Sequence, residues 1–343
     1  MAAFDQERYS RHVLFAGIGE EGQRRIVHSV VAIVGCGALG SAQADMLARA
    51  GVGQLRLIDR DFVEWSNLQR QALFHESDAH DSVPKAIALA RELKKINSSC
   101  GVHSDVEDFN SSNAEDFLTR VDLVMDGSDN FQARYLINDC SVKLHIPWIY
   151  GACVGSYGAV APFLPQETPC LRCLFPDSPA PGEGPTCDTA GIATPLPKMV
   201  AAMQVAEALK ILAGSLEHIH RALVSFDLWS NNFRSLEYGR SDAACVCCGR
   251  KQYDFLKGRQ ETEALSMCGR NSVQILPKRR QRIDLSSLGG RLRPLGTVTI
   301  SDYFLKLVIP DHELAVFKDG RAIIKGTTDP AVAKSLYARY VGD

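Results

Sequence analysis

Over the first 250 residues, the spacing of apolar positions changes repeatedly between that of strands and that of helices. Short apolar runs have the length of buried strands, and the segments between them have helical spacing. The predicted strands are 30–35, 54–59, 121–127, 147–152 and 222–227, and the predicted helices are 5–28, 38–51, a segment from Pro84, 130–144 and 197–214. Because strands that alternate with helices form βαβ units, the pattern predicts a Rossmann-like, doubly wound α/β fold with a mostly parallel sheet.

Two stretches depart from this pattern. Residues 164–195 are rich in Pro, Gly and Cys and show no period, which predicts a long loop. After about Cys268 the chain changes to short strands, with "KDG" as a hairpin turn and a helix at 330–342. We therefore expect two domains: 1–269, the α/β domain, and 270–343, a small α+β module.

Composition excludes several classes of protein. The 343 residues are 45% hydrophobic and 23% charged, with a net charge of −2, so no bulk basic field attracts nucleic acid or an anionic membrane. The start, "MAAFDQERYSRH", lacks a signal segment, and no apolar run approaches the roughly 20 residues that span a bilayer. We expect a cytoplasmic protein without nucleic-acid or membrane partners. Its eleven cysteines then indicate metal binding or catalysis more than disulfides.

A glycine-rich turn joins the first predicted strand to its helix. Gly35, Gly37 and Gly40 form G-x-G-x-x-G, and Asp59 ends the second strand, where an acid binds ribose hydroxyls. Alone, this pattern favours a nicotinamide or flavin enzyme. It indicates adenosine with phosphates more firmly than it indicates a dinucleotide.

Polar residues that follow Asp59 change this interpretation towards a triphosphate. They are Asn67, Arg70, Gln71, Lys85, Asp126 and Asp129. Two cations and an amide would neutralise charge as an α-phosphate is attacked, and a carboxylate would serve Mg²⁺. Each residue alone is typical of a solvated surface. In this order on one sheet edge, they favour ATP, and hydride transfer needs none of them.

Two C-x-x-C pairs predict a closed, structural zinc site. Four thiolates in two such pairs match tetrahedral Zn²⁺, and this interpretation is favoured over four buried thiols. The first pair is Cys170 and Cys173. The second begins at Cys245, and because the sequence there is "CVCCG", either Cys247 or Cys248 could complete it.

The order of these motifs resembles the E1-like adenylyltransferases, in particular the ThiF and MoeB proteins. The motifs are "RYSRH", "GCGALGS", "IDRDFVEWSNLQRQALF", "PK" before a helix, "DGSDN", "PCLRC", "TCDTAG" and "CVCCG", and they span residues 7–250. The resemblance selects Cys248 as the fourth ligand. It also matches Cys187 to a cysteine that forms a persulfide or a covalent link in some relatives and is dispensable in others.

The resemblance implies ATP-dependent adenylation of a ubiquitin-like sulfur-carrier protein with a C-terminal Gly-Gly. Asp59 would hold the ribose, Asn67, Arg70 and Lys85 the phosphates, and Asp129 the Mg²⁺. Arg11 would reach the triphosphate across a homodimer interface. A sulfur donor such as a cysteine desulfurase is a further expected partner.

The sequence is compatible with several carriers and with two other functions. The C-terminal module favours a ThiS-like carrier of thiamine synthesis over a MoaD-like carrier of molybdopterin synthesis. No cysteine follows Cys268, which excludes a working rhodanese domain there. The competing functions are a nicotinamide-dependent oxidoreductase, which Arg70, Lys85 and the zinc cysteines weaken, and a non-catalytic E1-like binding protein, which would be expected to have lost the ATP residues.

Overall fold

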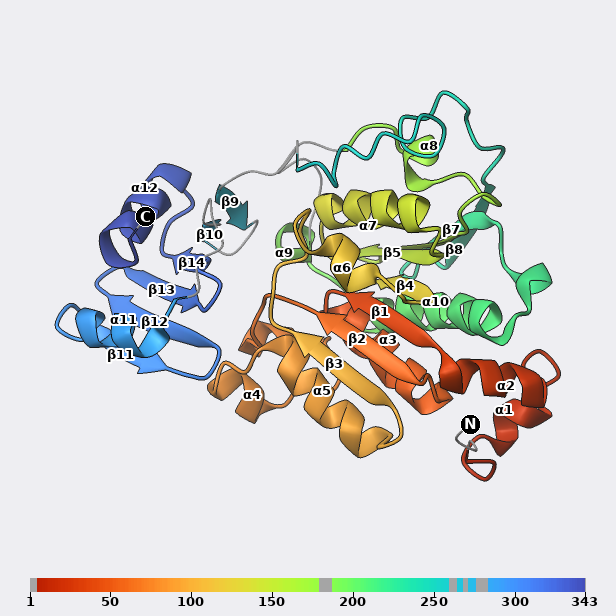
Figure 1. The fold of residues 1–343 in the computed structure, drawn as a ribbon, viewed down its shortest axis with the longest axis horizontal. Helices are drawn as coiled ribbons and strands as arrows, with labels where there is room; N and C mark the ends of the chain where they lie inside the picture. Colours follow the sequence, from red (N-terminus) through yellow and green to blue (C-terminus); the bar gives the residue numbers. More distant parts are fainter. Residues whose placement is uncertain (1–4, 179–186, 259–263, 268–270, 276–282, 343) are drawn as a thin grey trace. The chain divides into compact units, whose positions relative to one another are not determined.

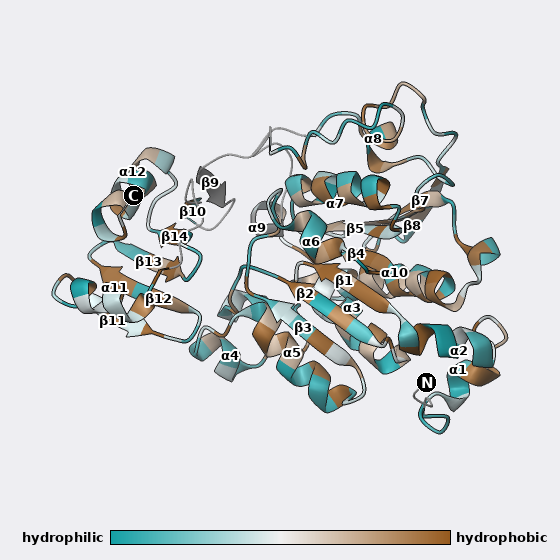
Figure 2. Ribbon diagram, viewed as in Figure 1, coloured by the Kyte–Doolittle hydropathy of each residue, from teal (hydrophilic) through white to brown (hydrophobic). Residues whose placement is uncertain are grey.

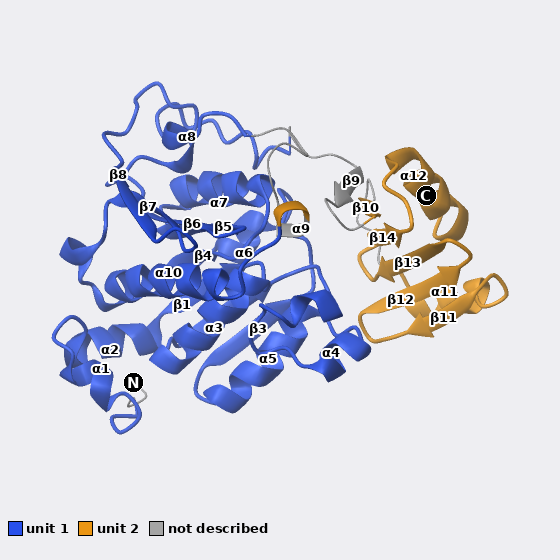
Figure 3. Ribbon diagram, turned by 180° about the vertical axis from the view of Figure 1, so that it is seen from behind, with its two compact units in different colours: residues 1–183, 191–259 blue, residues 184–190, 260–343 orange. Residues whose placement is uncertain are grey.

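The computed structural model describes residues 5–178, 187–258, 264–267, 271–275 and 283–342. The chain divides into two units, shown in different colours in Figure 3. The first comprises residues 1–183 and 191–259, and the second comprises residues 184–190 and 260–343. Each unit has a sheet and a hydrophobic core of its own.

An eight-stranded sheet organises the first unit (Figure 1). Its order is β3-β2-β1-β4-β5-β6-β7-β8, in which the pairs from β3 to β5 are parallel and those from β5 to β8 are antiparallel. The strands are β1 (Val30–Val34), β2 (Gln54–Ile58), β3 (Gly101–Asp105), β4 (Leu123–Asp126), β5 (Trp148–Val154), β6 (Tyr157–Phe163), β7 (Ala222–Asp227) and β8 (Asn232–Glu237).

Helices cover both faces of this sheet, and the alternation along β1 shows how. Val31 and Ile33 join a core cluster with residues of α3 (Ala38–Ala50), α5 (Lys85–Ile96) and α10 (Pro195–Ala213). Ala32 and Val34 join the opposite cluster with α6 (Ala114–Leu118) and α7 (Phe131–Leu144). Because both faces of β1 are covered, this strand is continuously apolar, as Figure 2 shows.

The doubly wound α/β prediction is confirmed, with local differences. The predicted helix 5–28 is two helices, α1 (Ser10–Leu14) and α2 (Gly19–His28), and the second begins at Gly19, whose φ is +64°. No strand was predicted for β3, β6 or β8. Every residue of β8 is exposed and β3 lies at the other sheet edge, so neither has an apolar run. The predicted loop 164–195 contains α8 (Leu171–Leu174) and α9 (Cys187–Ala190).

Short helices complete the first unit. They are η1 (Trp65–Asn67), α4 (Glu76–His80) and η2 (Leu216–His218). Within the described parts of the chain, every helix is too short or too polar to cross a membrane.

The second unit is α+β, as predicted. Its strands are β9 (Ala264–Met267), β10 (Ser272–Ile275), β11 (Thr297–Ile300), β12 (Phe304–Ile309), β13 (His312–Phe317) and β14 (Ala322–Lys325), in the antiparallel order β11-β12-β13-β14-β10-β9. Leu288 of α11 (Leu285–Leu292) and Ala333 of α12 (Pro330–Tyr340) share a core with these strands. The predicted "KDG" turn connects β13 to β14.

Candidate functional site

The carboxyl ends of β2, β1 and β4 lie side by side and carry the predicted site residues. The chain proceeds from β1 outward to β2 and β3, and then returns to β4 on the other side of β1. At such a reversal of strand order the loops diverge and leave a crevice at the carboxyl edge. The glycine loop follows β1, Asp59 follows β2, and the "DGSDN" loop follows β4.

The three glycines of the motif differ in the space that surrounds them, and so in the reason for having no side chain. Gly35 has φ +89°, and a Cβ there would lie 2.7 Å from the carbonyl oxygen of Gly127. A Cβ on Gly40 would lie 1.8 Å from the carbonyl oxygen of Gly35. At Gly37, a Cβ would first meet Gln71 Nε2, 3.9 Å away. Gly35 and Gly40 are thus required by packing, whereas Gly37 leaves space beside the amino end of α3, where a phosphate could approach.

Asp59 lies among backbone donors and nearby charges. Its carboxylate accepts hydrogen bonds from the N–H groups of Cys36 and Asp61, both at 2.6 Å. Burial raises the pKa of Asp59, and the Lys85 ammonium opposes this shift. The glycine loop therefore orients the carboxylate of Asp59, the residue that was predicted to bind ribose.

Lys85 is almost completely buried at the start of α5. It is 3% exposed, and its ammonium lies 3.1 Å from the carboxylate of Asp61. Arg60 lies beside the same acid and pairs with Asp108 at 2.7 Å. Burial lowers the pKa of Arg60, but the carboxylates of Asp108, Asp61 and Asp129 raise it above its usual value. The Asp129 carboxylate thus adds to the negative charge that acts on Arg60.

Asn67, Arg70 and Gln71 come from η1 and the turn after it. Asn67 is 1% exposed and its side-chain oxygen caps η1 by accepting the N–H of Glu64 at 3.0 Å. Arg70 donates to the carbonyl of Ser66 at 2.8 Å. Gln71 is 6% exposed, and its side-chain oxygen has no hydrogen-bond partner among the described residues. A buried unpaired amide oxygen next to the open position at Gly37 fits a site that is completed by a ligand.

A buried ion pair holds the loop after β4. The Arg134 guanidinium lies 3.1 Å from the Asp126 carboxylate, and it also donates to the carbonyls of Ser128 and Gly151. Burial raises the pKa of Asp126, and Arg134 opposes the shift. These bonds join the end of β4 and the middle of β5 to α7. Asp129 in this loop is exposed and thus available to a cation from solvent.

Arg11 does not belong to this group within its own chain. It is exposed on α1, which packs against α2 at the amino end of β1 (Figure 1). The glycine loop lies at the carboxyl end of the same strand. A role for Arg11 at a nucleotide site therefore requires a second chain.

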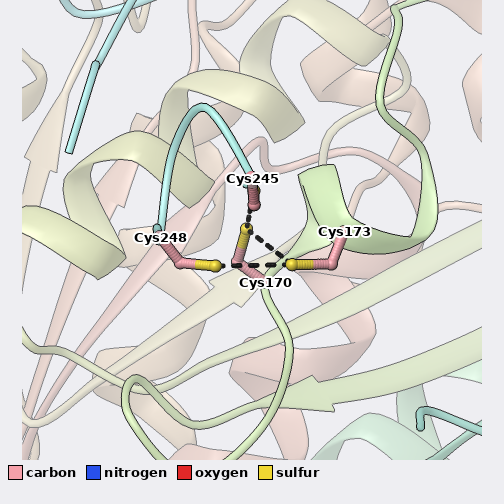
Figure 4. Close-up of side chains that lie close together, drawn as sticks. All are labelled: Cys170, Cys173, Cys245 and Cys248. Atoms are coloured by element: carbon pink, nitrogen blue, oxygen red, sulfur yellow. Dashed lines mark hydrogen bonds between the residues drawn. The ribbon is translucent and has the colours of Figure 1, made fainter. Parts of the chain in front are cut away.

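Four cysteine thiols gather at a separate site in the first unit (Figure 4). The sulfurs of Cys170, Cys173, Cys245 and Cys248 all lie within 4.8 Å of one another, and those of Cys173 and Cys248 are 3.3 Å apart. Zn–S bonds of about 2.3 Å in a tetrahedron place sulfurs about 3.8 Å apart, so the donor set fits zinc.

Cys247 lies outside this set of four. Its sulfur accepts a hydrogen bond from Asn138 Nδ2 at 3.3 Å, and Asn138 also binds the N–H of Leu171 in α8. Cys247 therefore helps to hold α8 beside the cluster. The backbone of Cys187 begins α9, and Cys268 lies outside the described residues.

Several residues of the site were missed in the sequence. Asp61 is the second acid of "DRD", two positions after Asp59, and that spacing was its available signal. Arg134 is a buried charge within a predicted helix, and its pairing with Asp126 depends on tertiary structure. The signal for Gly127 was its place in "DGSDN", but its contact with Gly35 spans two distant loops.

A glycine loop, an acid after the neighbouring strand and a reversed strand order define a nucleotide-binding α/β protein of the Rossmann-like class. The model of the ThiF family matches residues 9–247, and the chain belongs to this family. The resemblance to E1-like adenylyltransferases is thereby confirmed.

The relatives and solved structures agree with this assignment. The sulfur carrier protein ThiS adenylyltransferase of Bacillus subtilis (strain 168) is 44% identical over 337 residues, which cover 98% of this chain and 99% of the relative. The sulfur carrier protein adenylyltransferase of Thermus thermophilus is 39% identical over 246 residues, 70% of this chain and 90% of the relative. The structure of E. coli MccB with ATP has a TM-score of 0.61 and 25% identity, covering 71% of this chain and 75% of that one.

The packing of the glycine loop predicts unequal losses of stability for two alanine substitutions. Gly40→Ala should lower the free energy of unfolding by at least ~2 kcal/mol, because its Cβ would overlap the backbone at Gly35. Gly37→Ala should cost about 1 kcal/mol or less, because its Cβ has room. Urea denaturation followed by circular dichroism measures both. Equal losses in the two variants would contradict the different packing reasons.

Proposed function

We propose that this protein is an ATP-dependent adenylyltransferase that activates the C-terminal glycine carboxylate of a sulfur-carrier protein. The observation that carries the proposal is the buried Lys85 ammonium, which pairs with Asp61 at 3.1 Å, two residues after Asp59. A buried cation at this edge suits a triphosphate and has no task in hydride transfer. The B. subtilis relative, similar over nearly the whole chain, bears the corresponding name.

In this proposal the chain positions the reactants and neutralises charge. Asp59 holds the ribose, and Gly35, Gly37 and Gly40 admit the phosphates to the amino end of α3. Asn67, Arg70 and Lys85 hold the phosphates, and Asp129 binds the Mg²⁺ that enters with ATP. The carrier carboxylate attacks the α-phosphorus, an acyl-adenylate forms, and pyrophosphate leaves. Because the carboxylate is already a nucleophile, the step requires no general base.

Further elements of the proposal concern metal, partners and Cys187. Zn²⁺ at the four-cysteine cluster would join α8 to the segment 245–248, and it would supply structure without chemistry. The active assembly is a homodimer in which Arg11 reaches the partner's triphosphate. Cys187 is a candidate for later covalent chemistry with the carrier, and the sulfur donor would be a protein such as a cysteine desulfurase. The protein works in the cytoplasm.

ATP–pyrophosphate exchange tests the function directly. Exchange should require Mg²⁺ and a carrier that ends in Gly-Gly. We expect a ThiS-type carrier to be adenylated faster than a MoaD-type carrier at equal concentration, because the relative similar over almost the full length carries the ThiS name. Faster turnover of the MoaD-type carrier would overturn that preference. Failure of both carriers, with nucleotide binding intact, would favour a non-catalytic binding protein.

Arg70→Ala should slow the exchange about 100- to 1,000-fold, by analogy with the loss of one oxyanion donor. Arg49→Ala is the matched control, because Arg49 is an exposed arginine of α3 that pairs with Asp45 at 2.7 Å. The control should keep the wild-type rate. Normal exchange in Arg70→Ala would remove Arg70 from the phosphate site.

Mixed dimers test the placement of Arg11. Arg11→Ala and Lys85→Ala should each be nearly inactive. Mixing them should restore exchange, because a heterodimer then contains one site with both native residues. Subunit exchange is verified with two affinity tags. If verified heterodimers stay inactive, Arg11 does not act across the interface.

Metal analysis tests the zinc site. The purified protein should contain one zinc per chain, and Cys170→Ser should lose it. Cys247→Ser and Cys100→Ser should keep it, because Cys247 lies outside the set of four and Cys100 is a buried thiol elsewhere. Loss of metal in Cys247→Ser with retention in a Cys248→Ser variant would correct the fourth ligand.

A further inference from the structure

Asp61 connects the two halves of the proposed nucleotide site. Its own N–H donates to the Asp59 carboxylate at 2.6 Å, and its carboxylate lies 3.1 Å from the Lys85 ammonium. Its carbonyl also accepts the N–H of Lys85 at 2.9 Å. One residue therefore contacts both the ribose acid and the phosphate lysine.

The surrounding backbone makes this connection rigid. The segment after β2 runs antiparallel to the segment before α5, through a bridge between Phe62 and Pro84 and a hydrogen bond from Val63 to Val83 at 2.9 Å. Asp61 and Lys85 lie at the end of this short ribbon. The backbone at Lys85 is thus fixed in place. The Lys85 side chain can move only by rotation about its own torsions.

The charges around Lys85 explain why an acid is placed there. A buried ammonium needs a counter-charge, because burial without one is strongly unfavourable. The side chains of Asp61 and Lys85 are 14% and 4% exposed. The Arg60 guanidinium, 3.9 Å from Asp61, is already paired with Asp108 at 2.7 Å. The Asp61 carboxylate, 3.1 Å from the Lys85 ammonium, supplies such a counter-charge.

We propose that Asp61 is a positioning residue, which holds the Lys85 ammonium beside the nucleotide phosphates through a charged contact. The inference rests on the proposed function, because it assigns Lys85 to a triphosphate. Asp61 acts through Lys85 and makes no contact with the phosphates in this proposal. Its effect is therefore confined to ligands that carry phosphates.

The test compares ATP with adenosine by calorimetric binding to the full chain. Asp61→Asn retains the backbone bonds to Asp59 and Lys85 but removes the charge. We expect the Kd for ATP to rise about 10- to 100-fold, which corresponds to the loss of a hydrogen bond to a charged group. The Kd for adenosine should change less than about threefold, because the contact with Asp59 remains. Asp61→Glu should restore part of the ATP affinity.

Asp78→Asn is the matched control for a buried acid. Asp78 pairs with Arg91 at 2.7 Å and caps α4, away from Lys85. This variant should bind ATP and adenosine as the wild type does. Circular dichroism and urea denaturation establish that each variant is folded. If Asp61→Asn does not fold, the Asp61→Glu variant decides, with weaker ATP binding and unchanged adenosine binding expected.

The opposite results have distinct meanings. Unchanged ATP affinity in Asp61→Asn would overturn the positioning role. Tighter ATP binding would also overturn it, because it would show that Asp61 competes with the phosphates for Lys85. A parallel loss for ATP and adenosine would assign Asp61 a structural role only. Failure of the wild type to bind ATP would instead overturn the proposed function.

Discussion

The contact of three backbone segments without side chains between them underlies the whole site. Gly35, Gly40 and Gly127 pack so closely that a Cβ on any of them would lie less than 3 Å from backbone atoms of at least one of the other two. This contact brings the loop after β1, the first turn of α3 and the loop after β4 to one place. Asp59 is then oriented by the N–H of Cys36, and Asp129 is carried on the loop that begins at Gly127.

Buried charges fix what the glycine contact brings together. Arg134 neutralises Asp126 and binds two carbonyls beside it, while Asp61 and Lys85 pair at the end of the ribbon before α5. Removing one partner of such a pair leaves an uncompensated buried charge and costs about 3–5 kcal/mol. The residues proposed to contact the nucleotide are thus held in place by residues, such as Arg134 and Asp61, that would not contact it.

The sequence predicted those parts that have local signals. The apolar runs gave β1, β2 and β4, and the C-x-x-C spacing led to the four thiols that gather in the structure. Edge strands were missed because their exposed residues have no apolar run, as in β8. Arg134 and Asp61 were missed because their partners are determined by tertiary contacts. The choice of Cys248 over Cys247 needed the family resemblance, since both lie at plausible spacing.

The strand order also determines when the site can form during folding. Hairpins such as β5–β6 and β7–β8 join neighbouring segments, so their loops close at small entropic cost. β1 instead pairs with β4, so that Val31 lies opposite Leu123, and the intervening chain must first be arranged. A nascent chain that ends before β4 already contains the glycine loop and Asp59. It lacks Gly127, however, so the backbone contact that organises the loop is formed only when synthesis has passed β4.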